Sequence, residues 1–277
     1  MRGMQSSSPS EVPDDWSRSN RDARSTVATA ALVAIAVTSL LFGAVVALAG
    51  NLTGLLYSAL FAVIMSLVAA LGVAMRVQRR NLASAIGTVS ANGSPATEIY
   101  YSPRQFALLV ALMAALAGTC VIGAVHLYLS QGMSVASALL AGFGLLGATF
   151  PVSALLGRIR RGALALSEHG VSQRGWSFES SLRWADVVGV KAAYNGHPVI
   201  LLIGYTNTEW TPRYTTRLWR IDRLPPVPMI EVDCRKFDVD CYALFDYLTS
   251  YAESADLRYE LGTAAAVTRA ERTGSAH

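Results

Sequence analysis

The chain has 277 residues, of which 52% are hydrophobic and only 15% are charged, with a formal net charge of +4. Ordinary soluble proteins carry about 25% charged residues, so this composition argues against a soluble protein over the whole length. From position 158 to the end, 15 Lys and Arg stand against 14 Asp and Glu, so the soluble part has no basic excess. Nucleic acid is therefore excluded as an expected partner.

Four long stretches contain no Lys, Arg, Asp or Glu, and each has 24 or 25 residues. A membrane-spanning helix needs about 20 apolar residues, so each stretch is long enough to span. The first stretch lacks the short apolar core and the cleavage site of a signal peptide, which predicts a retained helix. The predicted spans are 26–50, 52–75, 106–129 and 133–157.

Arginines flank only one end of each predicted span, and the two short connections at the other ends, Asn51 and 130–132, are uncharged. Positively charged flanks stay in the cytoplasm. The sequence therefore predicts a multi-pass protein of the plasma (inner) membrane with both termini cytoplasmic. The flanking arginines are Arg18, Arg21, Arg24, Arg76, Arg79, Arg80, Arg104, Arg158, Arg160 and Arg161.

The predicted spans contain no carboxylate, Lys or Arg, whereas transporters and intramembrane enzymes generally need buried ionisable groups. His126 is the one residue there that could ionise, and beside Tyr128 we interpret it as interfacial. Small residues such as Gly142, Gly144 and Gly147 are frequent. They fit close packing of a four-helix bundle, or a face for a partner protein or a second copy of the chain.

The segments outside the spans differ in character. Residues 1–24 are polar and turn-rich, which predicts a disordered cytoplasmic tail, and Trp16 is its one large apolar residue. Trp16 could dip into the membrane interface. Residues 76–105 are predicted to form a cytoplasmic connection that lies on the membrane or against the soluble domain.

From Ala163 the hydrophobic period changes to two, with a hairpin turn at 168–170 and further strands up to the segment MIEVDC. Six or seven short strands within about 70 residues predict an antiparallel sandwich or barrel. Asp240 is a suitable N-cap for one amphipathic helix, which we expect to close the barrel end. Two short helical pieces are predicted beyond it, in 255–277.

The segments GALALSEHGVSQR and SLRWADVVGV, followed by a single closing helix, resemble bacterial pleckstrin-homology-like domains attached to membrane helices. The resemblance covers about Gly162 to Ala252, and the flanking segment FDVDCYALFDYLTSYAESADLRYELGTAAAV is similar to a tail of actinobacterial membrane proteins. It implies a four-helix membrane bundle plus an α+β cytoplasmic domain in 158–254, a pleckstrin-homology-like barrel or sandwich closed by a C-terminal helix. No catalytic residues come with it, because these domains bind different things.

One feature departs from the relatives that bind phosphoinositides. Those domains concentrate Lys and Arg between their first two strands, whereas the corresponding loop here, Ser167–Gly170, contains Glu168 and no basic residue. Specific recognition of inositol phosphates is therefore not expected.

No catalytic, metal or cofactor site is predicted. The three cysteines form no CxxC pair, and no HExxH, GxSxG or P-loop motif occurs. Some basic and aromatic residues are candidates for contact with lipid headgroups or a partner. The alternatives are flanking charges that serve topology for the first three, packing for the aromatics, and surface pairing with Glu209 and Asp222 for the later arginines. The candidates are Arg158, Arg160, Arg161, Trp210, Arg213, Tyr214, Arg217 and Arg220.

These observations predict a membrane-surface adaptor or regulator that is not an enzyme and has membrane lipids and a protein as partners. The alternative, based on the Gly- and Ala-rich helices, is a subunit or lipid guide in envelope lipid or small-molecule transport. A membrane-bound enzyme would require polar residues of 81–104 to meet the soluble domain at a common pocket.

Overall fold

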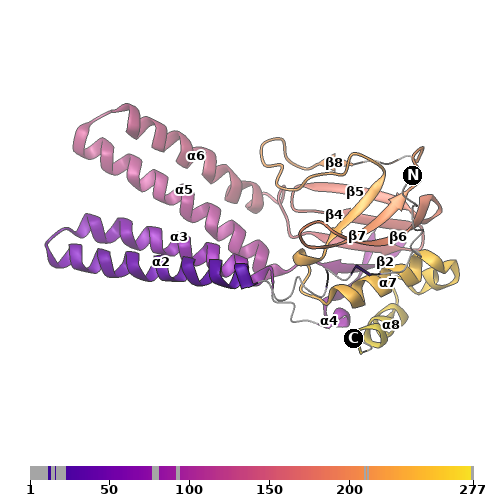
Figure 1. Cartoon of the computed structure of the whole chain (residues 1–277). Coiled ribbons are helices and arrows are strands. Elements are labelled where there is room, and N and C mark those ends of the chain that lie inside the picture. Colours follow the sequence, from indigo (N-terminus) through magenta and orange to yellow (C-terminus); the bar gives the residue numbers. More distant parts are fainter. Residues whose placement is uncertain are drawn as a thin grey trace, which may run out of the picture. The chain divides into compact units, whose positions relative to one another are not determined.

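A computed structural model describes residues 12, 13, 16, 23–76, 81–91, 94–208, 210 and 212–275 (Figure 1). The chain forms two compact units, each built from separated stretches. The helical unit comprises Asp22–Arg76 and Arg104–Ile159, and the sheet unit comprises Met1–Arg21, Val77–Pro103 and Arg160–His277. Most of the predicted tail and the flanking residues Arg18, Arg21, Arg79 and Arg80 lie outside the described residues.

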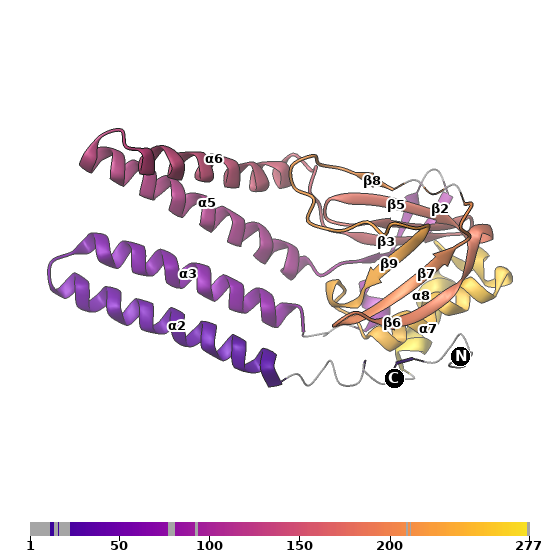
Figure 2. The same ribbon diagram turned by 45° about the horizontal axis from the view of Figure 1, so that its top comes forward.

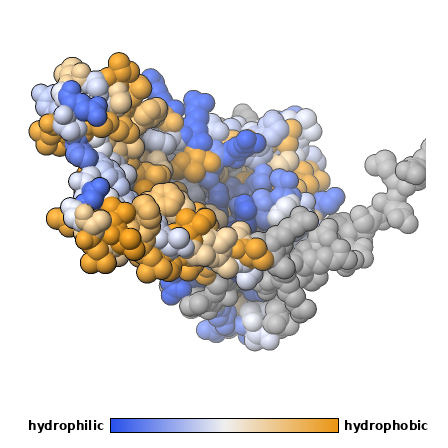
Figure 3. Space-filling view, turned by 60° about the vertical axis from the view of Figure 1, so that its left-hand side comes forward, coloured by the Kyte–Doolittle hydropathy of each residue, from blue (hydrophilic) through white to orange (hydrophobic). Residues whose placement is uncertain are grey.

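The helical unit confirms four apolar helices long enough to cross a membrane. Many of their large apolar side chains point outward, and Leu41 is 64% exposed. Figure 3 shows apolar residues over the surface of these helices, as lipid contact requires. The helices are α2 (Ala23–Leu48), α3 (Leu52–Ala74), α5 (Pro103–Gln131) and α6 (Val135–Leu155).

Each helical hairpin is closed by a tight turn and packed through small residues. Gly50 and Gly132 adopt positive φ angles at the two turns, a conformation that glycine favours. A Cβ atom added to Gly144 would lie 2.7 Å from Cγ2 of Val121, so this glycine permits the close approach of α6 to α5. In contrast, a Cβ added to Gly118 or Gly142 would meet no described atom within 4 Å.

A polar contact joins the two hairpins. The hydroxyl of Tyr57 on α3 hydrogen bonds with Nδ1 of His126 on α5 at 2.9 Å, and the two rings are stacked. The pairing joins the second and third apolar helices, which the connection 76–105 separates in sequence, so no local pattern predicts it.

Replacing Tyr57 with phenylalanine is expected to reduce the stability of the helical unit by about 0.6 kcal/mol, a typical value for such interhelical hydrogen bonds. The ring stacking would remain in this variant. The measurement is equilibrium unfolding of the full chain in mixed micelles, with Tyr128→Phe on α5 as the matched control. Equal stability losses in the two variants would contradict a role for the Tyr57 hydroxyl.

The sheet unit contains a six-stranded antiparallel sheet in the order β1-β2-β3-β4-β5-β8. Two of its strands come from the predicted connection 76–105, after the short helix α4 (Leu82–Ala85), and β2 pairs directly with β3. The sheet unit therefore includes residues before position 158, and the connection is part of its sheet. The strands are β1 (Ile86–Ala91), β2 (Ser94–Tyr100), β3 (Ala163–Ser167), β4 (Gly170–Arg174), β5 (Phe178–Arg183) and β8 (Arg213–Tyr214).

A second, three-stranded sheet has the order β6-β7-β9, and Figure 2 shows these strands side by side. The predicted hairpin between β3 and β4 is confirmed, as is the WADV turn, which forms the 3₁₀ helix η1 (Trp184–Asp186). Among the described residues the two sheets are not closed into a barrel, which corrects the predicted closure. The strands are β6 (Val187–Tyr194), β7 (Pro198–Gly204) and β9 (Met229–Asp233).

Helices pack on this sheet and complete the core. As predicted, Asp240 caps α7 (Cys241–Glu253), since its carboxylate accepts hydrogen bonds from the N–H groups of Tyr242 and Ala243. The apolar face of α7 is buried against β6 and the following helices, η3 (Ala255–Glu260) and α8 (Ala264–Ser275). The core consists of inward side chains from both sheets and α7, including Leu164, Leu166, Val171, Leu182, Ile200, Leu202, Ile230, Val232, Leu244 and Leu248.

Trp16 belongs to this core and is only 2% exposed. Its indole N–H donates to the carbonyl of Ala193 on the β6 edge at 2.8 Å. Its ring meets those of Tyr242 and Phe245 edge to face, at 5.5 and 6.0 Å between centroids. Trp16 is therefore an anchor within the sheet unit and not an interfacial residue.

A buried polar cluster joins distant parts of the same unit. One carboxylate oxygen of Asp222 accepts from the backbone N–H of Trp176 at 2.8 Å, and the other pairs with the ammonium of Lys236. The side chain of Gln173 donates to the hydroxyl of Tyr101 at 3.1 Å. Burial, followed by the charge of Asp222, raises the pKa of Tyr101 far above its ordinary value, so this hydroxyl stays neutral.

Candidate functional site

A groove of about 920 Å³ lies on the six-stranded sheet, over the face that points away from the core. The strand register explains its floor. Glu98, Ala165, Ser172 and Ser181 occupy neighbouring positions on β2, β3, β4 and β5 and form one row. Because three of these side chains are small, the floor is low. This floor results from the alternation between Ala163 and Arg174, which puts leucine and valine on the core face of the sheet and alanine and serine on the groove face.

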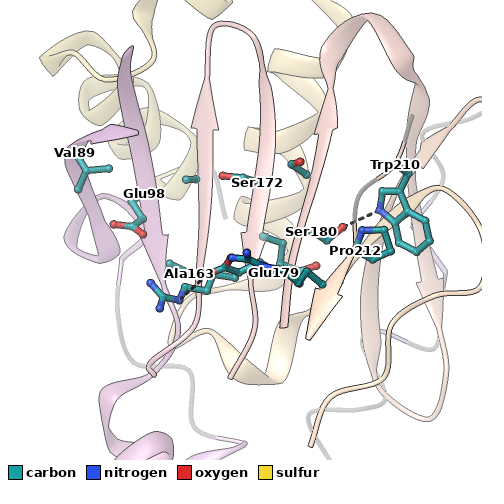
Figure 4. Close-up of a pocket in the computed structure, with 13 residues that line it drawn as sticks. Val89, Glu98, Ala163, Ser172, Glu179, Ser180, Trp210 and Pro212 are labelled. Atoms are coloured by element: carbon teal, nitrogen blue, oxygen red, sulfur yellow. Dashed lines mark hydrogen bonds and ion pairs between the residues drawn. The ribbon is translucent and has the colours of Figure 1, made fainter. Parts of the chain in front are cut away.

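Larger residues form the two sides of this groove (Figure 4). Val89 and Glu98 rise from β1 and β2 on one side, and Trp210 and Pro212 lie beyond β5 on the other. The indole N–H of Trp210 donates to the hydroxyl of Ser180 at 2.8 Å, which fixes the ring at the β5 edge. The groove thus has an aromatic wall held in place by a hydrogen bond.

A second row of cross-strand partners, two residues along each strand from the first row, contains charged side chains. The carboxylate of Glu179 lies between two arginines, with its Oε2 2.7 Å from Arg213 and its Oε1 3.8 Å from Arg174. Partly exposed ion pairs of this kind stabilise a fold by about 1 kcal/mol or less, so a ligand can rearrange them at low cost. Two guanidiniums thus flank one carboxylate here, and the second lining carboxylate, Glu98, lies on β2.

Tyr100 lies on the same face, two residues from Glu98 on β2. A hydrogen bond with the Glu98 side chain, assisted by burial, raises the pKa of Tyr100 to about 12. The guanidinium of Arg161 lies over the Tyr100 ring, 4.8 Å from its centroid, and its Nε donates to the carbonyl of Tyr101. Tyr100 is therefore a neutral hydrogen-bonding group at physiological pH and not a general base.

The described lining of the groove contains carboxylates, guanidiniums and hydroxyls. None of the described residues that line it is a histidine or a cysteine. His197 pairs with Asp233 at 3.6 Å in the other sheet, and burial lowers its pKa despite that carboxylate. Among the described residues no group of three His, Cys, Asp or Glu side chains could hold a metal ion.

The structure separates the predicted contact residues into three places. Trp210 and Arg213 line the groove, and Arg161 packs on Tyr100 near its end. Tyr214, Arg217 and Arg220 belong to the chain that follows, where Arg220 lies over the Tyr214 ring at 4.7 Å. Arg158, in the helical unit, and Arg160 are exposed.

Sequence reasoning missed Val89, Glu98, Arg174 and Glu179 as groove residues. Arg174 and Glu179 are cross-strand partners, and the hairpin between β4 and β5 would have indicated this pairing. Val89 and Glu98 could have been found only by recognising that the connection between the second and third spans contains strands.

No family model, curated protein or solved structure matches this chain. The resemblance to pleckstrin-homology-like domains therefore stays a prediction.

Proposed function

We propose that the chain is a multi-pass inner-membrane protein whose sheet unit is a pleckstrin-homology-like adaptor at the cytoplasmic surface. In this proposal the groove binds a partner protein. The observation that carries it is the groove itself. It has a low floor, an aromatic wall and a row of charged side chains, and it lies on the face of the sheet opposite the core. The described lining residues include no histidine or cysteine, which favours binding over catalysis.

The connectivity of the sheet unit supports the placement of all its parts on the same side of the membrane. β2 precedes the third apolar helix and pairs with β3, which follows the fourth, so an even number of crossings must separate them. Trp16 precedes the first helix and contacts α7, which gives the same requirement over all four. Four crossings meet both conditions, and the arginine flanks favour the cytoplasm for that side.

The lining of the groove suggests the chemistry of its occupant. Arg174 and Arg213 favour an anionic group, while Trp210, Pro212 and Val89 favour an apolar one. Three strand spacings separate Glu98 on β2 from Ser181 on β5, which is about 14 Å. A short acidic segment of a partner protein in extended conformation fits these features best.

Photo-crosslinking in cells tests this proposal. A photoreactive amino acid at Ser181 on the groove floor is expected to capture a defined protein, whereas the same probe at exposed Lys191 on β6 is not. Adding Arg213→Glu should reduce the capture severalfold, because it replaces attraction for an acidic segment with repulsion. Arg183→Glu on β5 is the matched control. Capture that is equal at the two probe positions, or unaffected by Arg213→Glu, would refute the groove as the binding site.

The alternative, a lipid guide or transport subunit, draws support from Gly118 and Gly142, which the described packing leaves open. Deleting the protein would then alter the lipid profile of the envelope. An unchanged profile would contradict this function without affecting the adaptor proposal.

A further inference from the structure

We propose that residues 215–227, here named the arginine arm, contact the anionic headgroups of the membrane surface. The proposal rests on the membrane location proposed above, but it does not depend on what fills the groove. The arm joins β8 to β9, and its sequence TTRLWRIDRLPPV intersperses basic with apolar residues.

The arm presents its charged and apolar side chains to solvent. The Thr216 hydroxyl accepts from the N–H of Trp219 at 3.1 Å and donates to its carbonyl at 2.9 Å, which closes a turn. Arg217 and Leu218 lie at the tip of this turn, and Leu218 is 59% exposed. A leucine next to an exposed arginine suits the boundary between headgroups and acyl chains.

The arm keeps its positive charge, because its one carboxylate is turned inward. Arg217, Arg220 and Arg223 are exposed, whereas Asp222 is buried and pairs with Lys236 and the Trp176 N–H. The predicted pairing of these arginines with Asp222 is therefore wrong, and the other predicted partner, Glu209, lies outside the described residues. A surface with three arginines and exposed apolar groups complements an anionic bilayer.

Covalent connectivity places the arm at the end of the sheet unit where the chain arrives from the spans. The backbone of Thr215 donates to the carbonyl of Ser177, and that of Ile221 donates to its hydroxyl. The neighbouring carbonyl of Trp176 accepts from the N–H of Arg160. Only the four residues 156–159 separate Arg160 from the last residue of α6. The chain therefore enters the sheet unit from the last apolar helix next to the residues that hold the arm.

The opposite end of the same sheet unit supplies a control position. β5 runs from Phe178, beside the arm, to Arg183, a rise of about 17 Å. The turn 205–208 lies beyond that far end, because the N–H of Tyr205 donates to the carbonyl of Asp186, just after β5. Asn207 in this turn is exposed, like Leu218, and should stay away from lipid.

The test uses the full chain in nanodiscs of phosphatidylcholine with a minor fraction of phosphatidylglycerol. A photoreactive amino acid replaces Leu218, Asn207 or, as a positive control in α2, Leu41. Lipid adducts are identified by mass spectrometry. We expect adducts at Leu41 and Leu218 but not at Asn207. At Leu218, phosphatidylglycerol should be enriched about fivefold over its share of the bilayer, the factor that corresponds to about 1 kcal/mol from one arginine.

Charge reversal separates electrostatic contact from mere proximity. With Arg217→Glu and Arg220→Glu, the enrichment of phosphatidylglycerol at Leu218 should disappear, whereas Arg183→Glu should leave it unchanged. Adducts at Leu41 without any at Leu218, an adduct with protein instead of lipid, or no enrichment would overturn the arm's role alone. Loss of adducts at Leu41 would refute the membrane location and with it both proposals. Failure of the Ser181 capture, with normal adducts at Leu218, would refute only the groove.

Discussion

Replacing Asp222 with alanine is expected to destabilise the sheet unit by about 3–5 kcal/mol, because the substitution leaves the Lys236 ammonium without its buried partner. The backbone N–H of Trp176 would lose its acceptor as well. Equilibrium denaturation of the full chain in detergent, followed by near-UV circular dichroism, measures the loss. The matched control is Asp186→Ala, which breaks the exposed pair with Arg183 and should cost about 1 kcal/mol or less.

A second substitution identifies the cause of this effect. If the penalty comes from an unpaired buried charge, adding Lys236→Met to Asp222→Ala should restore part of the lost stability, since an apolar side chain carries no such penalty. An additive loss in the double variant would show that the two side chains act independently. A loss no greater than that of Asp186→Ala would show that the cluster does not hold the unit together.

Asp222 also illustrates which features of the fold can be predicted from the sequence and which cannot. Alternating hydrophobicity, turn residues and the Asp240 cap depend on neighbours in the chain, and they predicted most strands and α7 correctly. Asp222 looked like a surface partner for nearby arginines, because its burial depends on contacts with Trp176 and Lys236. Such contacts are set by the tertiary fold and have no local pattern.

The groove could not be predicted from the sequence for the same reason. Its floor depends on the pairing of β2 with β3, two strands that the third and fourth apolar helices separate in sequence. The alternation in ATEIYY after a turn-rich stretch was a local signal for β2. A local pattern of this kind can reveal a strand, but it does not reveal which strand becomes its neighbour.

Replacing Trp16 with alanine is expected to weaken the docking of its segment by about 3 kcal/mol, because a buried indole is removed from its contacts with Tyr242 and Phe245. The backbone amides of α7 and β6 that depend on this contact should then exchange with solvent about 100-fold faster. Hydrogen exchange of the full chain in detergent, read by mass spectrometry, measures the change. The exchange of β3 and β4, which belong to the other sheet, serves as the internal reference.

Trp16→Phe is the matched variant, because phenylalanine can keep the ring contacts but cannot donate to the Ala193 carbonyl. It should cost only about 1 kcal/mol, the usual value of one such hydrogen bond. Unchanged exchange of α7 and β6 in Trp16→Ala would contradict the anchor. It would also remove the support for an even number of crossings that comes from the N-terminal segment. The pairing of β2 with β3 would then support only the two crossings between those strands.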